Sequence, residues 1–303
     1  MPNAPLVSLG YFTGLNTVDD PLRFTYRVID TPAGKKAGYP ALKLDNLDID
    51  NAWGLSSRSG YDKQLACTSA HSLFAVDDTC LYVDASSLYE LAATFDSSTL
   101  LKSGLATGAR MSYALVNDRI YLTNGSYIGY YKQSAVHDLP VPVANYKVSL
   151  PPGQRIAYYR GLLFVASGKI LYISDALCDH YDIRTGYRVF ANNITMVRPV
   201  GKGVFVSDGD TYFLAEGENF RRDWVLDIDC IPYTDIRING KDIKDGADSN
   251  YAMWTSTKGI CLGTPDGQIR NLTAAQYAMA SHGIGGAVLR DNNGIKHYLA
   301  VLE

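Results

Sequence analysis

Residues 113–131, YALVNDRIYLTNGSYIGYY, contain two short turns that separate three stretches rich in apolar and aromatic side chains. Residues 156–174, IAYYRGLLFVASGKILYIS, repeat this order of strand, polar turn, strand, tight turn and strand. Aromatic and β-branched residues are typical of strands, and a dipeptide such as Asn124-Gly125 suits a tight hairpin because it tolerates positive φ. Each stretch therefore predicts a three-stranded antiparallel unit.

The same unit recurs along most of the chain, at residues 73–91, 196–214, 253–272 and 286–302. The first turns of the six units follow one another at intervals of 40, 43, 41, 56 and 35 residues, and we mark them by Asp77, Asn117, Arg160, Gly201, Thr257 and Asn292. A period near ~40 residues with three or four strands per unit is typical of a β-propeller. A sandwich or a pair of barrels also contains regular hairpins, but sandwiches space single strands at ~8–12 residues without this grouping in threes. We therefore expect an all-β fold formed by a single β-propeller.

The two ends of the chain are expected to close the ring. The last unit supplies only two strands, about residues 286–290 and 295–302, and residues 41–49 and 54–61 supply two more. Pairing these strands in one sheet would leave no open edge at the seam. The sequence thus predicts six blades with a composite last blade, and a seventh blade within residues 223–248 is the alternative.

Two segments stand outside the regular repeat. Residues 1–40, with four prolines up to Pro32, are expected to form an extended N-terminal arm, and residues 41–303 the propeller domain. The long interval before Thr257 contains residues 223–248, which we expect to provide an outer fourth strand and an excursion. Loops on a rigid scaffold often carry recognition, so the arm and this excursion are the expected contact segments.

Composition excludes several classes of protein. A formal net charge of −3 lacks the basic surface that binds nucleic acids. No apolar run approaches the ~18 residues of a transmembrane helix, and the first residues do not resemble a Sec-type signal peptide. The five cysteines are odd in number and show no CxxC spacing, which favours a reducing compartment and predicts neither a disulfide framework nor a zinc site.

No residue pattern predicts a catalytic, cofactor-binding or metal site. The cluster Cys178-Asp179-His180 with Asp182 has metal-ligating atoms, but ligands on consecutive residues seldom converge, so we expect a polar loop between blades. Asp45, Asp48 and Asp50 resemble the start of a calcium loop, yet Trp53 and Ser59 occupy the positions that need Gly and a bidentate Glu.

Two carboxylate pairs could in principle serve glycoside hydrolysis. Asp77-Asp78 lies in an expected hairpin turn, where Asp is favoured for its own backbone hydrogen bonds. Asp227 and Asp229 alternate with Ile228, as exposed positions on a strand would. We therefore predict no catalytic residues, no cofactor and no bound metal.

One further pattern runs along the chain and consists of Gly14, Asn16, Asn46, Asp48, Asp50, Gly54, Arg58 and Gly60. Read in this order, these residues resemble the pattern of a family of tailed-bacteriophage virion proteins, with Ser59 in place of the family's proline. The later stretches VNDRIYLTNG, at residues 116–125, and KGICLGTPDGQIRNLT, at residues 258–273, also look like that family. The resemblance extends from about Leu9 to Leu302, whereas residues 223–248 have no counterpart.

This resemblance implies a structural component of a phage tail or head-to-tail hub, present in several copies in the virion and assembled in the host cytoplasm. Its partners would be other virion proteins, with neither nucleic acid nor a membrane span involved, and we expect no enzymatic activity. Two alternatives remain. The tyrosine content, 22 of 303 residues, would suit a carbohydrate-binding receptor module. A propeller glycan hydrolase or lyase would instead place convergent carboxylates at the channel mouth.

Overall fold

The computed structural model describes residues 11–15, 27–31, 34–41, 47–49, 55–57, 63–177, 179–243, 248–274, 283–292 and 295–302. Within these ranges the protein is all-β, and its helical pieces are two short 3-10 turns, η2 (Glu216–Glu218) and η3 (Gly240–Ile243). The prediction of an all-β chain is therefore confirmed.

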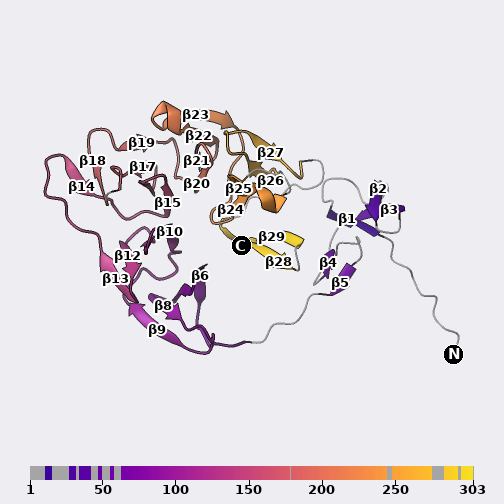
Figure 1. Ribbon diagram of the computed structural model, residues 1–303, viewed down its shortest axis with the longest axis horizontal. Coiled ribbons are helices and arrows are strands. Elements are labelled where there is room, and N and C mark those ends of the chain that lie inside the picture. Colours follow the sequence, from indigo (N-terminus) through magenta and orange to yellow (C-terminus); the bar gives the residue numbers. More distant parts are fainter. Residues whose placement is uncertain are drawn as a thin grey trace.

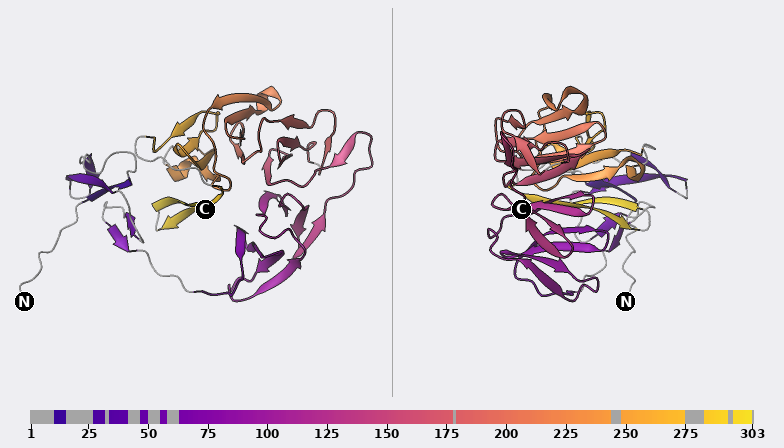
Figure 2. Two further views of the ribbon diagram at one scale, coloured as in Figure 1. Left: turned by 180° about the vertical axis from the view of Figure 1, so that it is seen from behind. Right: turned by 60° about the vertical axis from the view of Figure 1, so that its left-hand side comes forward.

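Five four-stranded antiparallel sheets lie in an arc around a common centre, as in a propeller (Figures 1 and 2). The first sheet contains β6 (Ala70–Val76), β7 (Thr79–Asp84), β8 (Ser87–Leu91) and β9 (Ser98–Lys102), and the second β10 (Ser112–Val116), β11 (Arg119–Thr123), β12 (Ile128–Lys132) and β13 (Ala135–Asp138). The third contains β15 (Arg155–Tyr159), β16 (Leu162–Ser167), β17 (Ile170–Ile173) and β19 (Tyr187–Val189). The fourth contains β20 (Met196–Val200), β21 (Gly203–Ser207), β22 (Thr211–Ala215) and β23 (Arg221–Leu226), and the fifth β24 (Ile236–Asn239), β25 (Asn250–Ser256), β26 (Gly259–Gly263) and β27 (Ile269–Asn271).

The other strands form smaller sheets. Strands β14 (Lys147–Ser149) and β18 (His180–Asp182) pair on the outer edge of the arc, and β28 (Gly285–Asn292) pairs with β29 (Ile295–Leu302) at its end (Figure 1). A separate hairpin is formed by β4 (Leu47–Ile49) and β5 (Leu55–Ser57). Strand β3 (Gly34–Ala41) lies between β1 (Tyr11–Leu15) and β2 (Arg27–Thr31) in a three-stranded sheet.

The tight turns expected from the sequence are present. Gly125, Gly168, Gly209 and Gly267 all have positive φ, between +57° and +119°, where a side chain would be strained. The first turn of the third sheet has positive φ at both Arg160 and Gly161, as a type I′ hairpin requires. Local turn chemistry thus fixes the register of the hairpins, which in turn directs alternate side chains to opposite faces of each sheet.

Each sheet buries apolar side chains against the next one along the chain. Leu81 and Leu122 belong to the cluster between the first and second sheets, and Phe164 and Val204 to the cluster between the third and fourth. Trp254 of the fifth sheet is completely buried, 5.9 Å between ring centroids from Phe205 of the fourth. The core is therefore divided among the interfaces between neighbouring sheets and is not a single central cluster.

Strands β28 and β29 continue this series because Leu289 and Tyr298 pack against the fifth sheet. The sequence also predicts that these two strands pair with residues 41–49 and 54–61 in one composite sheet. β4–β5 and β28–β29 form separate two-stranded sheets, so within the described residues that prediction is wrong. β4 and β5 have three residues each, and such short strands can offer few ladder hydrogen bonds to offset the entropy lost on pairing.

Part of the expected arm is also structured. Strands β1, β2 and β3 lie within residues 11–41, so stretches of the expected arm form a small sheet of their own, and the division at residue 40 stays a prediction. The parallel pairing of β1 with β3 could not be inferred from proline content, because it joins segments that are more than twenty residues apart.

The long interval before the fifth sheet contains a buried crossing. Strand β23 is the outer fourth strand that the sequence predicts, and the chain then runs to β24 through residues 227–235. Ile228, Ile231 and Thr234 are buried there, so the expectation of an exposed recognition loop is wrong for this part. The apolar residues of the excursion pack inward because removing apolar surface from water stabilises the folded protein.

Candidate functional site

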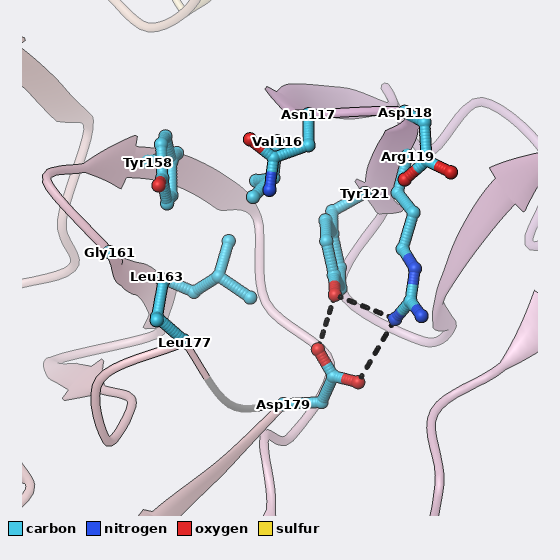
Figure 3. Close-up of a pocket in the computed structure, with 10 residues that line it drawn as sticks. All are labelled: Val116, Asn117, Asp118, Arg119, Tyr121, Tyr158, Gly161, Leu163, Leu177 and Asp179. Atoms are coloured by element: carbon cyan, nitrogen blue, oxygen red, sulfur yellow. Dashed lines mark hydrogen bonds and ion pairs between the residues drawn. The ribbon is translucent and has the colours of Figure 1, made fainter.

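A pocket of about 240 Å³ opens between the second and third sheets (Figure 3). Three chain segments line it: the β10–β11 hairpin, the β15–β16 hairpin and the loop after β17. The lining residues are Val116, Asn117, Asp118, Arg119, Tyr121, Tyr158, Gly161, Leu163, Leu177 and Asp179. Since the first turns of two successive units meet here, the repeat itself creates the pocket.

Backbone hydrogen bonds fix the loop after β17 to the β15–β16 hairpin and to the residue that follows β14. The Leu177 amide donates a hydrogen bond to the Gly161 carbonyl over 2.7 Å, and the Leu150 amide donates to the Asp179 carbonyl over 3.1 Å. Leu177 has φ +58°, and its side chain is 80% exposed at the pocket mouth. These backbone bonds place Asp179 opposite the second sheet.

The polar centre of the pocket consists of Tyr121, Asp179 and Arg119. The Tyr121 hydroxyl donates a short hydrogen bond to Asp179 Oδ1, while Arg119 Nη1 lies 3.7 Å from Asp179 Oδ2 and 3.5 Å from the Tyr121 oxygen (Figure 3). The Arg119 guanidinium also lies 4.7 Å from the centroid of the Tyr130 ring, a favourable cation–π position. Asp179 is thereby held as a hydrogen-bond acceptor in a shielded position, with its side chain 13% exposed.

The ionisable groups of the pocket are held by hydrogen bonds and by neighbours of opposite charge. Burial, and then the hydrogen bond to Asp179, raise the pKa of Tyr121 to about 12, so this phenol stays neutral at physiological pH. Asp118, on the pocket's edge, has its pKa lowered by a hydrogen bond from Lys132, whose Nζ is 2.6 Å from Asp118 Oδ2. Each carboxylate of the pocket therefore has a cationic neighbour.

The Cys178-Asp179-His180-Asp182 cluster does not converge in the structure. Asp179 faces the pocket, His180 Nε2 lies 3.3 Å from Asp175 Oδ2, and Asp182 is bound by Arg184 at 2.7 Å. Cys178 lies outside the described residues. No group of three potential metal ligands occurs within the described parts of the chain.

The carboxylate pairs are also separated by their partners. Asp229 Oδ1 accepts hydrogen bonds from the Thr257 amide and hydroxyl at 3.0 and 2.9 Å, whereas Asp227 is exposed beside Lys258 at 3.1 Å. Both residues lie beyond the end of β23, not within a strand as predicted. Asp77 is in the β6–β7 turn with φ +48°. Asp45 and Asp50 lie outside the described residues, and of Asp48 the structure describes only the backbone.

The sequence predicts that Asp179 lies in a polar loop between blades, but it does not associate this residue with Tyr121 or Arg119. Tyr121 and Asp179 are 58 positions apart, and each belongs to a pattern that is ordinary for a hairpin or a polar loop. When the sequences of the second and third units are aligned, Asn117 and Arg160 mark equivalent first turns. This alignment is the signal that predicts that the two turns lie at the same end of neighbouring sheets.

A second feature lies on the outer edge of the arc, around β14 and β18 (Figure 1). We call it the outer apolar strip: Val141, Val143, Tyr146, Val148 and Ile183, with exposed fractions of 82, 102, 55, 46 and 44%. The Ile183 amide donates to the Tyr146 carbonyl over 3.0 Å, and the Ser149 hydroxyl donates to the Pro140 carbonyl over 2.9 Å. These bonds bring residues of the two segments together on one surface.

Charged side chains border the outer apolar strip and are already paired with each other. Lys147 Nζ lies 2.6 Å from Asp175 and 3.3 Å from Asp182. The Arg184 guanidinium lies 4.3 Å from the Tyr146 ring centroid. A contiguous apolar surface bordered by polar residues is typical of a protein interaction site.

Comparison with known proteins gives information on the fold. No protein-family model matches the chain, and no curated protein matches it. The chain is similar to BBS1N in its complex with ARL6DN, with a TM-score of 0.51, 9% identity and coverage of 95% of this chain and 97% of that one. It is also similar to the gluconolactonase XC5397 from Xanthomonas campestris (TM-score 0.45, 10% identity, 78% and 87% covered) and to virginiamycin B lyase from Staphylococcus aureus (0.44, 11%, 77% and 84%).

These findings agree with a propeller-like fold and require one correction. We expected no enzymatic activity because no catalytic motif was found, yet proteins with a similar fold include a gluconolactonase and a lyase. The expectation is therefore withdrawn. At such low identity the likeness concerns the fold alone and transfers neither activity nor site. In the described residues, no helix is long and apolar enough to cross a membrane.

Proposed function

We propose that this protein is a component of a tailed-bacteriophage particle, in the tail or at the head-to-tail junction, and that it acts through contacts with other virion proteins. The observation that carries the proposal is the outer apolar strip. Five exposed apolar side chains, on β14, on the loop before it and directly after β18, are costly in water and are stabilised by a partner surface. The resemblance of the hairpin segments to virion proteins supports the same function.

We further propose that the molecule is a closed six-bladed propeller in which the β28–β29 and β4–β5 hairpins together occupy the sixth position. Two observations support this. Val288 and Val301 expose 57 and 70% of their surface on the β28–β29 hairpin. The first sheet presents an apolar hollow of about 480 Å³ whose lining includes Leu73, Tyr82 and Phe95. Packing of blades on both sides would cover these surfaces, as it does between the other sheets.

The contact proposal is tested by charge substitutions in the strip. Val143→Asp places a carboxylate at the most exposed residue of the strip, where docking would desolvate it. Leu272→Asp is a matched control, because Leu272 is 50% exposed and lies next to β27, in a different sheet. Each variant is supplied to a phage that lacks its own copy of the gene, and its copy number in purified particles is measured by quantitative mass spectrometry.

We expect Val143→Asp to be at least about tenfold depleted from particles and Leu272→Asp to be incorporated normally, a ratio that corresponds to about 1.4 kcal/mol. Both variants should keep the melting temperature of the unsubstituted protein, because both positions are exposed. Val141→Asp is a second single substitution in the strip. If particles incorporate both the Val143→Asp variant and the Val141→Asp variant at the normal copy number, the proposal is contradicted.

A further inference from the structure

The pocket between the second and third sheets is a built site that the contact proposal does not use. Its polar centre combines a carboxylate and a guanidinium from different elements, and Tyr121 fixes the carboxylate (Figure 3). Neither the Asp179 side chain nor the Arg119 side chain lies on the outer apolar strip.

The charge of the lining indicates a neutral ligand. Asp179 is next to Arg119, and Asp118 is next to Lys132, so the formal charges cancel in pairs. An anion would be repelled by two carboxylates, and a cation would compete with two resident cations. A neutral molecule avoids both penalties.

The hydrogen-bonding capacity of the pocket favours hydroxyl groups. An ionised carboxylate has about four lone-pair sites and a guanidinium five N–H donors, so the contacts with Tyr121 do not exhaust either group. A carboxylate beside a guanidinium presents an acceptor and a donor a few ångströms apart. Adjacent hydroxyls on a ring each donate one hydrogen bond and accept others, which matches this pair.

The remaining lining offers apolar surface. Val116, Leu163 and Leu177 contribute aliphatic side chains and Tyr158 contributes a ring, and Leu177 stands at the mouth. Pockets for drug-sized ligands have volumes of roughly 300–1,000 Å³, so a cavity of about 240 Å³ admits a smaller molecule. The ligand must combine hydroxyl groups with C–H surface in one compact ring.

We propose that this pocket binds a single ring of a neutral saccharide, with Asp179 and Arg119 contacting adjacent hydroxyls and Leu177 covering the C–H face. Tyr121 is a positioning residue that holds Asp179. The inference does not rest on the proposed role in a virion, because its observations come from a different surface.

The test uses the full chain and three neutral probes, the methyl glycosides of glucose, galactose and mannose. Glucuronic acid and glucosamine serve as charged comparisons. Binding is followed by saturation-transfer NMR and by chemical-shift titration, with an expected dissociation constant on the order of 1 mM for the preferred neutral ring. Absence of binding for all three neutral probes at tens of millimolar would overturn the proposal, and so would tighter binding of a charged comparison.

Three variants locate the binding. Asp179→Asn keeps the shape of the side chain and should weaken binding about tenfold or more, the loss expected for a hydrogen bond to a charged group. Leu177→Gly removes the exposed lip while keeping a backbone with φ +58°, which glycine adopts readily, so it tests the site even if Asp179→Asn is unstable. Asp227→Asn alters an exposed carboxylate outside the pocket and is the matched control.

We expect Asp179→Asn and Leu177→Gly to lose affinity and Asp227→Asn to bind as the unsubstituted protein does. Equal affinity in all three variants would show that the sugar binds elsewhere and would refute the assignment. Incorporation into particles should be unchanged in Asp179→Asn, since its outer apolar strip is intact. Failure of the pocket proposal and failure of the contact proposal are therefore distinguishable.

Discussion

The ion pair between Arg198 and Asp235 joins the fourth sheet to the buried crossing, and its removal should destabilise the folded protein. Arg198 Nε lies 2.8 Å from Asp235 Oδ2, and Nη2 lies 2.5 Å from the same oxygen and 2.8 Å from the Asp235 carbonyl. The Asp235 side chain is 2% exposed and that of Arg198 30%. Asp235→Ala would leave the guanidinium partly buried with only the carbonyl as its acceptor.

Breaking a buried pair by removing one partner costs about 3–5 kcal/mol. We expect the lower end, about 3 kcal/mol, because the Arg198 side chain retains access to water at 30% exposure. A chain of 150–250 residues loses about 2–4 °C per kcal/mol, and a longer one somewhat less, so the melting temperature should fall by about 5 °C or slightly more. The double variant Arg198→Met with Asp235→Ala should recover part of this loss, since it leaves no unpaired charge.

The assay is thermal and urea unfolding, followed by far-UV circular dichroism. Lys241 and Asp248 form a matched exposed pair, with an Nζ–Oδ2 distance of 2.5 Å and side chains 62 and 68% exposed. Asp248→Ala should leave both unfolding midpoints unchanged, because solvent screens this pair. If Asp235→Ala and Asp248→Ala behave alike, the reasoning about the buried crossing is refuted.

Four further outcomes are expected. Tyr233→Leu should lower the free energy of unfolding by about 1–2 kcal/mol relative to Tyr233→Phe in urea titrations, because the Arg155 guanidinium lies 3.5 Å from the ring centroid. Gly203→Ala should lower the melting temperature by several degrees and Gly217→Ala should not, since a Cβ would meet the Leu214 carbonyl oxygen at 2.4 Å in the first case and open space in the second. Deletion of the residues after Asn293 removes β29 and should give insoluble or molten protein in solubility and ANS-binding assays, whereas deletion of residues 1–6 should be tolerated. The pKa of Tyr121 is raised to about 12, so this phenol stabilises the folded protein by an amount that is fully present below pH 10 and is lost as pH rises through 12. In an ultraviolet titration, Tyr121→Phe should lack one phenolate transition at high pH.

Local patterns in the sequence account for much of the sheet structure. The dipeptides Ser167-Gly168 and Asp208-Gly209 predict tight turns, and the structure has positive φ at both glycines. Such turns depend on a few neighbouring residues, so they can be inferred without knowledge of the rest of the fold. The apolar stretches on both sides of each turn pair as expected, and their alternation directs Phe164 and Val204 into the same cluster.

Several failed predictions concern contacts between distant segments. The composite sheet that the described residues do not form, the sheet of β1, β2 and β3, and the pocket around Asp179 each depend on which segments meet in space. Proline content describes one segment at a time, and metal-ligand spacing was sought within single loops. Tyr121 and Asp179 are typical residues of their own segments, and only the packing of the second sheet against the third gives them a common role.

The buried crossing, residues 227–235, departs from the repeat and contacts several other segments through Tyr233. Tyr233 has φ +68°, a conformation that non-glycine residues seldom adopt, and its ring lies against Arg155 at 3.5 Å and Arg110 at 5.3 Å. Arg110 also donates a hydrogen bond to the carbonyl of Gly285, the first residue of β28. Arg110, two residues before β10, and Arg155, the first residue of β15, therefore both contact Tyr233 of the crossing, and Arg110 also contacts the C-terminal hairpin. The crossing, which has no counterpart in the repeat, thus links residues beside the second and third sheets to the C-terminal hairpin.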